Sequence, residues 1–207
     1  MTAPGLASLA LDPSRTALVV IDLQRGIVSR EVAPHTAADV VVRSARLASR
    51  FRALNALVVL VRVAYSADDA DRLKPSADVP PLAGPPPPDW ADLVPELGMA
   101  PLDVVVTKRQ WGAFYGTELE LQLVRRGVRT LVLCGISTNF GVESTARDAY
   151  ERGYGLVFAE DSMAGLSAEA HAFATNTIFP RIGQVRSTAQ ILTALGAREP
   201  AAKPTSA

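Results

Sequence analysis

Thr16-Ala-Leu-Val-Val-Ile-Asp22 is an unbroken apolar run, rich in β-branched residues, that ends at a carboxylate. Runs of this kind are typical of strands that are covered on both faces, whereas strands with one wet face alternate apolar and polar residues. Five further runs of strand-forming residues follow along the chain, at residues 57–63, 103–107, 131–134, 156–159 and 183–186. The sequence therefore predicts six strands in a sheet covered on both faces.

Segments of helical length separate these runs, and their apolar residues recur at roughly the 3.6-residue period of a helix. Gly127, Gly153 and Gly196 stand where three of these helices are expected to end. The predicted helices span residues 36–54, 118–126, 142–152, 168–178 (ending before Pro180) and 188–195. Strands that alternate with helices predict an α/β fold of three layers, with a six-stranded, mainly parallel sheet and helices on both faces.

The whole pattern fits one domain over residues 1–197. Residues 198–207 are small and polar, which predicts a flexible tail. Residues 74–95 carry eight of the 15 prolines, so this segment can form neither a regular helix nor a central strand. Its length predicts either a lid over a site or a subunit contact.

Composition narrows the classes of function. The 21 Lys and Arg residues balance 21 Asp and Glu residues, so the net charge gives no reason to expect a nucleic acid or a membrane surface as partner. The sequence shows no signal-peptide pattern and no apolar stretch of membrane-spanning length, which predicts a cytoplasmic protein. The single cysteine, Cys134, excludes an intrachain disulfide and a Cys-rich zinc site, so it is either a nucleophile or part of the core.

Ligands of open α/β sheets bind at the carboxyl ends of the strands. Asp22 and Gln24 follow the first predicted strand, Lys108 and Arg109 follow the third, and residues 135–141 follow the fourth. Taken singly, Asp22 could be a turn residue and Lys108 a solvated surface residue. Together they predict an acid and a base at one edge of the sheet.

Three motifs follow one another along the chain: Val19-Val-Ile-Asp22-Leu-Gln24, Lys108 with Phe114-Tyr-Gly-Thr117-Glu-Leu119, and Gly135-Ile-Ser-Thr138-Asn-Phe-Gly-Val142-Glu-Ser-Thr-Ala146-Arg-Asp-Ala149. Together they resemble the motifs of the isochorismatase-like hydrolase superfamily. The resemblance extends from about Thr16 to Leu195. It implies a six-stranded parallel sheet with helices on both sides, a small-molecule substrate, no cofactor, and a homodimer or homotetramer.

In the amidohydrolase branch of this superfamily the catalytic residues are Asp, Lys and Cys, and the resemblance places them at Asp22, Lys108 and Gly141. Glycine has no nucleophile, so a covalent thiol mechanism cannot run through position 141. Cys134 lies inside an apolar strand, where a thiol has a raised pKa and packs as a small hydrophobic side chain. We therefore expect Cys134 to be structural.

True isochorismatases resemble this chain in carrying glycine at the nucleophile position, and they cleave a vinyl ether by protonating its terminal carbon with the aspartate. The resemblance thus implies Asp22 as general acid, with Lys108 orienting it or binding a substrate carboxylate. A nearby ammonium lowers the pKa of an aspartate, so burial has to raise the pKa of Asp22 by more than Lys108 lowers it. The Tyr and His of the isochorismatase motif are missing at Ser137-Thr-Asn139-Phe-Gly141, so isochorismate itself is not indicated.

Further residues are candidates for the pocket. Gln24, Phe114, Ser137 and Phe140 are predicted to bind substrate, and Trp111 and Tyr115 to border the pocket. The resemblance also implies a cis peptide between Ile136 and Ser137 and an oxyanion-type site at the backbone amides of Phe140 and Gly141. Basic side chains that could bind an acidic ligand are Arg25, Arg72, Lys74 and Arg109.

No metal site is expected. The nicotinamidase branch carries an Asp-x-His motif and a further His after the second strand, but the matching stretch here has Asp68, Asp69 and Asp71 and no histidine. His35 and His171 are not spaced as a ligand pair.

Two alternatives to a hydrolase remain. A non-catalytic member of the superfamily, acting as a small-molecule-binding protein or a scaffold, would also keep Asp22 and Lys108, although an unused buried charge pair is costly. A dinucleotide-binding oxidoreductase requires a Gly-x-Gly-x-x-Gly turn, which residues 22–26 lack.

Overall fold

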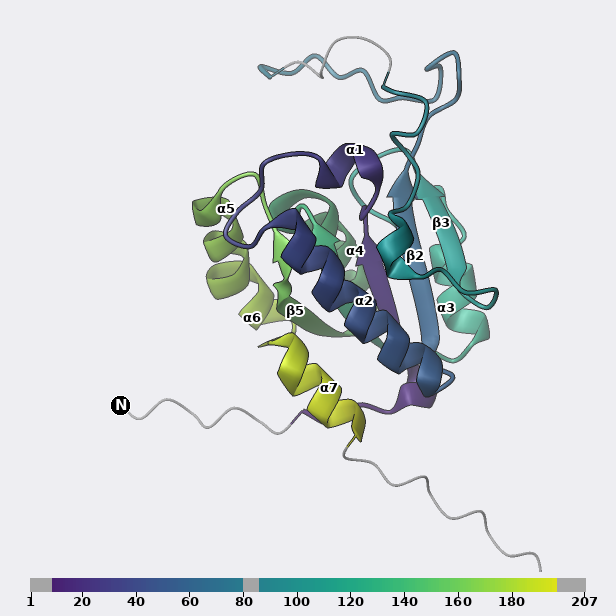
Figure 1. Cartoon of the computed structure of the whole chain (residues 1–207), viewed down its shortest axis with the longest axis vertical. Coiled ribbons are helices and arrows are strands. Elements are labelled where there is room, and N and C mark those ends of the chain that lie inside the picture. The colour runs from purple at the N-terminus through teal and green to yellow at the C-terminus, as the bar shows by residue number, and fades with distance from the viewer. Residues whose placement is uncertain (1–8, 80–85, 197–207) are drawn as a thin grey trace, which may run out of the picture.

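The computed structural model describes residues 9–79 and 86–196. Six strands form one sheet in the order β3-β2-β1-β4-β5-β6, and each neighbouring pair is parallel. The strands are β1 (Thr16–Ile21), β2 (Leu57–Val63), β3 (Val104–Lys108), β4 (Thr130–Ile136), β5 (Gly155–Ala164) and β6 (Gln184–Arg186). The predicted α/β sheet is confirmed (Figure 1).

Helices cover both faces of this sheet (Figure 1). On one face lie α2 (Ala37–Ala53) and α7 (Thr188–Gly196); on the other lie α3 (Leu119–Arg125), α4 (Glu143–Glu151) and α6 (Phe179–Ile182). Shorter elements are α1 (Arg25–Val28), α5 (Ala168–Phe173), the 3₁₀ turns Pro13–Arg15 and Pro95–Leu97, and the π-helical turns Thr138–Val142 and Ala174–Ile178. None of the described helices is long and apolar enough to span a bilayer.

The two layers of helices explain why the strands read as unbroken apolar runs. In β1, Leu18 and Val20 pack in the core under α2, whereas Val19 and Ile21 pack in the core under α3 and α4. All six residues of β1 are buried. Because helices cover both faces of the strand, the side chains that point to either face are buried, and residues 17–21 are all apolar.

Two predicted boundaries are wrong. The helix expected to end before Pro180 continues from α5 through the π-helical turn Ala174–Ile178 into α6, and Pro180 lies in the first turn of α6. A proline is tolerated there because its missing N–H has no helical partner in a first turn. Strand β5 runs five residues beyond its predicted end, to Ala164, because Met163 and Ala164 still pair with Gly135 and Ile136 of β4. Within this extension the Asp161 carboxylate accepts the N–H and the hydroxyl of Thr188 (both 2.7 Å). The predicted tail, residues 198–207, lies outside the described residues.

Candidate active site

Asp22 and Lys108 meet at the carboxyl edge of the sheet. Lys108, the last residue of β3, donates a hydrogen bond from Nζ to Oδ2 of Asp22 (2.7 Å) and a second to the carbonyl oxygen of Trp111 (2.7 Å). Strand β2 lies between β3 and β1, so the long lysine side chain spans one strand to reach the aspartate. The structure therefore brings together the acid and the base indicated by the sequence.

Asp22 directly follows the last residue of β1. Its φ of 53° lies in the left-handed region, which aspartate tolerates better than most residues. Its N–H donates to the carbonyl oxygen of Val61 in β2 (2.9 Å), so the turn remains tied to the sheet. The carboxylate is thus fixed at the strand end rather than carried on a mobile loop.

Burial decides the protonation of this carboxyl group. Asp22 is only 6% exposed, and desolvation raises its pKa from 3.8 to about 6, against the lowering effect of the Lys108 ammonium. The second oxygen, Oδ1, is buried and has no hydrogen-bond partner in the described residues. A carboxyl group with such a pKa and one free oxygen can carry a proton near neutral pH and donate it to a bound molecule.

A cavity of about 290 Å³ opens beside this pair. Of the predicted site residues, Asp22, Lys108, Gly141, Ser137, Phe140, Trp111 and Arg72 line it. A Cβ atom placed on Gly141 would lie 3.0 Å from Oδ2 of Asp22 and 3.3 Å from Nζ of Lys108. Position 141 therefore faces the acid–base pair directly, and glycine keeps that space open.

Two predicted pocket residues lie elsewhere. Phe114 is 4% exposed and packs in the core against Tyr154, with the two ring centroids 6.0 Å apart. The guanidinium of Arg152 lies 4.8 Å from the centre of the Phe114 ring. Tyr115, the next residue, is 78% exposed. The structure therefore gives Phe114 a packing role under α3 and α4 and does not bring it to the cavity.

Gln24 is buried, and its amide supports the site from behind. Nε2 donates to the carbonyl oxygens of Val63 (3.0 Å) and Trp90 (3.2 Å), and Oε1 accepts the N–H of Val63 (2.8 Å). These bonds occupy both ends of the amide, and Gln24 is not among the residues that line the cavity. The structure places Gln24 as a brace between β2 and Trp90 rather than as a substrate ligand.

Trp90, which the sequence analysis did not single out, lines the cavity together with Tyr65 and Arg30. A Cβ atom on Gly26 would lie 1.8 Å from the Trp90 ring, so only glycine lets the indole pack over the turn after β1. The N–H of Gly26 donates to the Trp90 carbonyl oxygen (3.0 Å). Part of the proline-rich segment thus reaches the cavity; whether this segment closes over a ligand stays a prediction.

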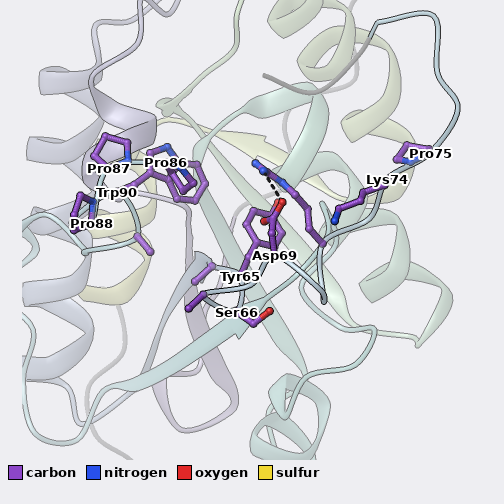
Figure 2. Close-up of a pocket in the computed structure, with 13 residues that line it drawn as sticks. Tyr65, Ser66, Asp69, Lys74, Pro75, Pro86, Pro87, Pro88 and Trp90 are labelled. Atoms are coloured by element: carbon purple, nitrogen blue, oxygen red, sulfur yellow. Dashed lines mark hydrogen bonds and ion pairs between the residues drawn. The ribbon is translucent and has the colours of Figure 1, made fainter. Parts of the chain in front are cut away.

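A larger hollow of about 800 Å³ adjoins the cavity. Figure 2 shows its walls, with Pro86, Pro87 and Pro88 on one side and Lys74 and Pro75 on the other. Tyr65, Arg72 and Trp90 line both spaces, and Arg72 pairs with Asp69 (3.3 Å) while its guanidinium lies 4.5 Å from the centre of the Tyr65 ring. The hollow forms a basic approach to the acid–base pair.

Of the two features expected in the turn after β4, the cis peptide is present, whereas the Phe140 amide is already hydrogen-bonded. The peptide between Ile136 and Ser137 is cis, as the resemblance implied. The N–H of Phe140, however, donates to the carbonyl oxygen of Ser137 (3.2 Å), so this amide is not free to form an oxyanion-type site. The Phe140 side chain lines the cavity and packs against Trp111, with ring centroids 4.9 Å apart.

Comparison with known proteins identifies the family. The protein-family model of the isochorismatase domain matches residues 16–190, which make up most of the chain. The chain belongs to the isochorismatase family. The uncharacterized isochorismatase family protein YecD of Escherichia coli O157:H7 is 54% identical over 187 residues, which cover 90% of this chain and 100% of that protein.

Other family members extend this picture. A solved structure of an isochorismatase family protein from Burkholderia thailandensis has a TM-score of 0.87 and 49% identity, and the match covers 90% of this chain and 98% of that one. The ureidoacrylate amidohydrolase RutB of Methylorubrum extorquens is 49% identical over 73 residues, 35% of this chain and 29% of RutB. The similarity to this RutB is confined to one part of the chain, whereas the ureidoacrylate amidohydrolase RutB of Variovorax paradoxus is 31% identical over 185 residues, 78% of this chain and 73% of that protein.

Cys134 does not belong to the site. It is fully buried in the core under α2, and burial raises the pKa of its thiol to about 12. A thiol that stays protonated and cannot be reached is no nucleophile. The expectation that Cys134 is structural is confirmed.

The loop after β2 does not supply the metal site of the nicotinamidase branch. Asp71 accepts the N–H of Ser66 (2.7 Å) and pairs with Arg109, and Asp68 accepts the Ser66 hydroxyl (2.6 Å). These carboxylates shape the loop, and within residues 9–79 and 86–196 they form no cluster of three metal-ligating groups. Arg109 is occupied by the same ion pair, whereas Arg72 reaches the cavity.

Proposed function

We propose that this protein hydrolyses a small anionic molecule by proton transfer from Asp22, without a covalent thiol intermediate, and that the scissile group is a vinyl ether. The observation that carries the proposal is the Asp22 carboxyl group, with a pKa of about 6 and an unpartnered Oδ1, beside the cavity. General acids work best when their pKa lies close to the working pH.

The proposed reaction begins when the protonated Asp22 donates its proton to the terminal carbon of the vinyl ether double bond. The ether oxygen stabilises the resulting cation as an oxocarbenium ion, and water adds to its carbon atom. The adduct then collapses to a ketone and an alcohol, and the proton released in the addition of water restores the acid. Lys108 holds Oδ2 (2.7 Å), so it orients the carboxyl group and stabilises the carboxylate after proton transfer.

Basic and aromatic side chains support an anionic substrate. Arg30 and Arg72 line the cavity, and a guanidinium binds a carboxylate through paired hydrogen bonds. Trp111 and Phe140 supply an apolar wall for the body of the molecule. This combination of a cationic entrance and an apolar wall favours a small organic acid over a neutral amide.

The test compares turnover of a panel of vinyl ethers, isochorismate and amides by the full chain and by Asp22→Asn. The variant keeps the shape of the side chain but cannot act as the acid, so we expect kcat to fall about 10²- to 10⁴-fold. Glu151→Gln, an exposed acid at the end of α4, is the matched control and should keep wild-type turnover.

Two results would contradict the proposal: turnover that survives in Asp22→Asn, or a wild-type protein that turns over amides and no vinyl ether. The non-catalytic alternative predicts something different. In that case no compound on the panel is converted, but an organic acid raises the melting temperature of the wild type more than that of Arg72→Gln.

A further inference from the structure

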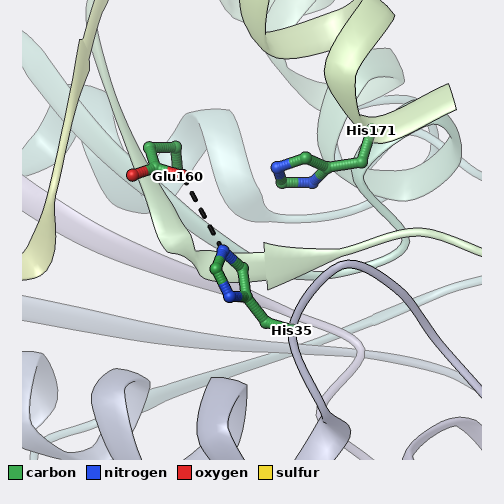
Figure 3. Close-up of side chains that lie close together, drawn as sticks. All are labelled: His35, Glu160 and His171. Carbon is green, nitrogen blue, oxygen red and sulfur yellow. Dashed lines mark ion pairs between the residues drawn. The ribbon is translucent and has the colours of Figure 1, made fainter. Parts of the chain in front are cut away.

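The side chains of His35, Glu160 and His171 lie close together (Figure 3). One ligand atom from each of the three lies within 4.8 Å of the other two, and Nε2 of His35 is 3.8 Å from Oε2 of Glu160. The sequence spacing of the two histidines gave no sign that the fold brings them together beside Glu160. They lie far apart in the sequence, so no short motif could reveal that the fold brings them together.

Three separate elements hold these side chains. His35 lies in the loop before α2, Glu160 in β5 and His171 in α5. The loop is fixed next to His35, because Ala33 and Gly165 exchange two backbone hydrogen bonds (2.9 and 2.8 Å). The cluster is therefore built on anchored backbone rather than on chance contact between long surface side chains.

Thr138 orients the buried member of the cluster. Its hydroxyl oxygen lies 2.8 Å from Nδ1 of His171, and both residues are buried. When Nδ1–H donates to this hydroxyl, the lone pair of Nε2 is free for a metal ion. A metal-binding histidine almost always has such a partner on its other nitrogen, which fixes the tautomer and the plane of the ring.

We propose that His35, Glu160 and His171 bind a divalent transition metal ion, with Zn²⁺ as the expected occupant. Two imidazole nitrogens and one carboxylate oxygen form a ligand set that suits Zn²⁺, and water completes the tetrahedron. Ligand atoms about 2.0–2.2 Å from the ion lie about 3.3–3.6 Å apart in such a tetrahedron. The distance of 3.8 Å between Nε2 of His35 and Oε2 of Glu160 is close to this range. Both side chains are partly exposed, so small rotations can bring their ligand atoms to the distances that the ion requires.

The site is separate from the acid–base cavity, because none of the three side chains lines that cavity. The ion would join the loop before α2, strand β5 and helix α5 to one another. Through His171, whose Nδ1 lies 2.8 Å from the Thr138 hydroxyl oxygen, it would also be linked to the first residue of the turn Thr138–Val142, whose fourth residue is Gly141. Its role is therefore to fix this end of the fold and the turn, and the proposed proton transfer does not pass through it.

The test is calorimetric titration of Zn²⁺ into the full chain, purified without a histidine tag and stripped with a chelator. We expect one saturable site per chain, with at least about tenfold weaker binding in His35→Ala and in Glu160→Gln. Both residues are partly exposed, so these variants keep the buried packing intact. Glu169→Gln removes an exposed acid from the same helix as His171 and should bind Zn²⁺ as the wild type does.

Cobalt(II) provides a second readout that is independent of catalysis. The Co²⁺-loaded wild type should show the visible absorption of a tetrahedral ion with nitrogen and oxygen ligands, and Thr138→Val should bind Co²⁺ about 10- to 100-fold more weakly. The proposal is overturned if Zn²⁺ shows no saturable binding to the wild type. It is also overturned if binding is unchanged in both His35→Ala and Glu160→Gln.

Discussion

Asp22 and Cys134 are both buried ionisable groups: Asp22 directly follows β1, and Cys134 lies in the neighbouring parallel strand β4, opposite Val20 of β1. Burial raises the pKa of each, to about 6 for the carboxyl group and about 12 for the thiol. Asp22 borders the cavity beside Gly141, whereas Cys134 packs in the core under α2. Burial alone therefore does not make a reactive group.

The neighbouring charges account for the rest of the difference. The Lys108 ammonium lowers the pKa of Asp22, which brings it into the range where an acid is useful at neutral pH. At Cys134 burial raises the thiol pKa, an interaction with the Ser44 side chain lowers it only in part, and the carboxylate of Asp161 raises it further. The surroundings of Asp22 thus suit a carboxyl group that transfers a proton, whereas the surroundings of Cys134 suit a buried side chain that only packs.

The largest expected effect is that of Lys108→Met, which removes the partner of a buried carboxylate. We expect the free energy of unfolding to fall by about 3–5 kcal/mol in urea titrations at alkaline pH, where Asp22 is ionised even without its partner and its charge is left buried and unpaired. The loss should shrink as the pH is lowered, since protonation removes that charge. Arg109→Met, which breaks the partly exposed ion pair with Asp71, is the control and should leave the free energy of unfolding nearly unchanged, because solvent screens exposed ion pairs. Equal stability of both variants would show that the buried pair is not special.

Gly141→Ala narrows the space beside the pair. The added methyl group would lie 3.0 Å from Oδ2 of Asp22, so it displaces either the carboxyl group or the substrate. We expect kcat/KM on the substrate found in the panel to fall by about tenfold to 100-fold, with little change in melting temperature. Gly196→Ala, at the end of α7 and 3.8 Å from the nearest atom of Arg50, serves as the control. Wild-type kcat/KM in Gly141→Ala would mean that the reacting group binds elsewhere.

The pH dependence follows from the raised pKa of Asp22. A general acid must be protonated, so kcat/KM should fall about tenfold per pH unit above pH about 6. An aspartate at its ordinary pKa of 3.8 would place this limb about two units lower. Steady-state rates across the acid and neutral range measure its position. A rate that rises through pH 6 would instead assign Asp22 the role of a base.

The smallest effect is expected for Cys134→Ser. The thiol cannot be reached and stays protonated, so kcat and KM should match the wild type within about twofold, measured on the panel substrate. The hydroxyl group that replaces it is buried, so a stability loss of about 1–3 kcal/mol is the only expected change. Loss of turnover in a variant that remains folded would reverse the comparison between Asp22 and Cys134.

Much of the fold could be predicted from local patterns. Runs of strand-forming residues located all six strands, and glycine stops located the ends of α3, α4 and α7, because strand and helix periods depend on residues close in sequence. The predictions failed where polar residues continue an element, as at Asp161 in β5, or where a π-helical turn accommodates a proline, as near Pro180. Those outcomes depend on tertiary hydrogen bonds and on packing.

The sequence by itself determined the order of the strands along the chain, the acid and base at two strand ends, and the absence of a nucleophile at Gly141. Only the tertiary structure decided that Phe114 packs in the core, that Gln24 braces Trp90, and that the pKa of Asp22 is raised. It also brought His35 and His171 to Glu160. The reason is physical: residue type and spacing specify local conformation, whereas side-chain direction, burial and contacts between distant segments arise only when the chain packs.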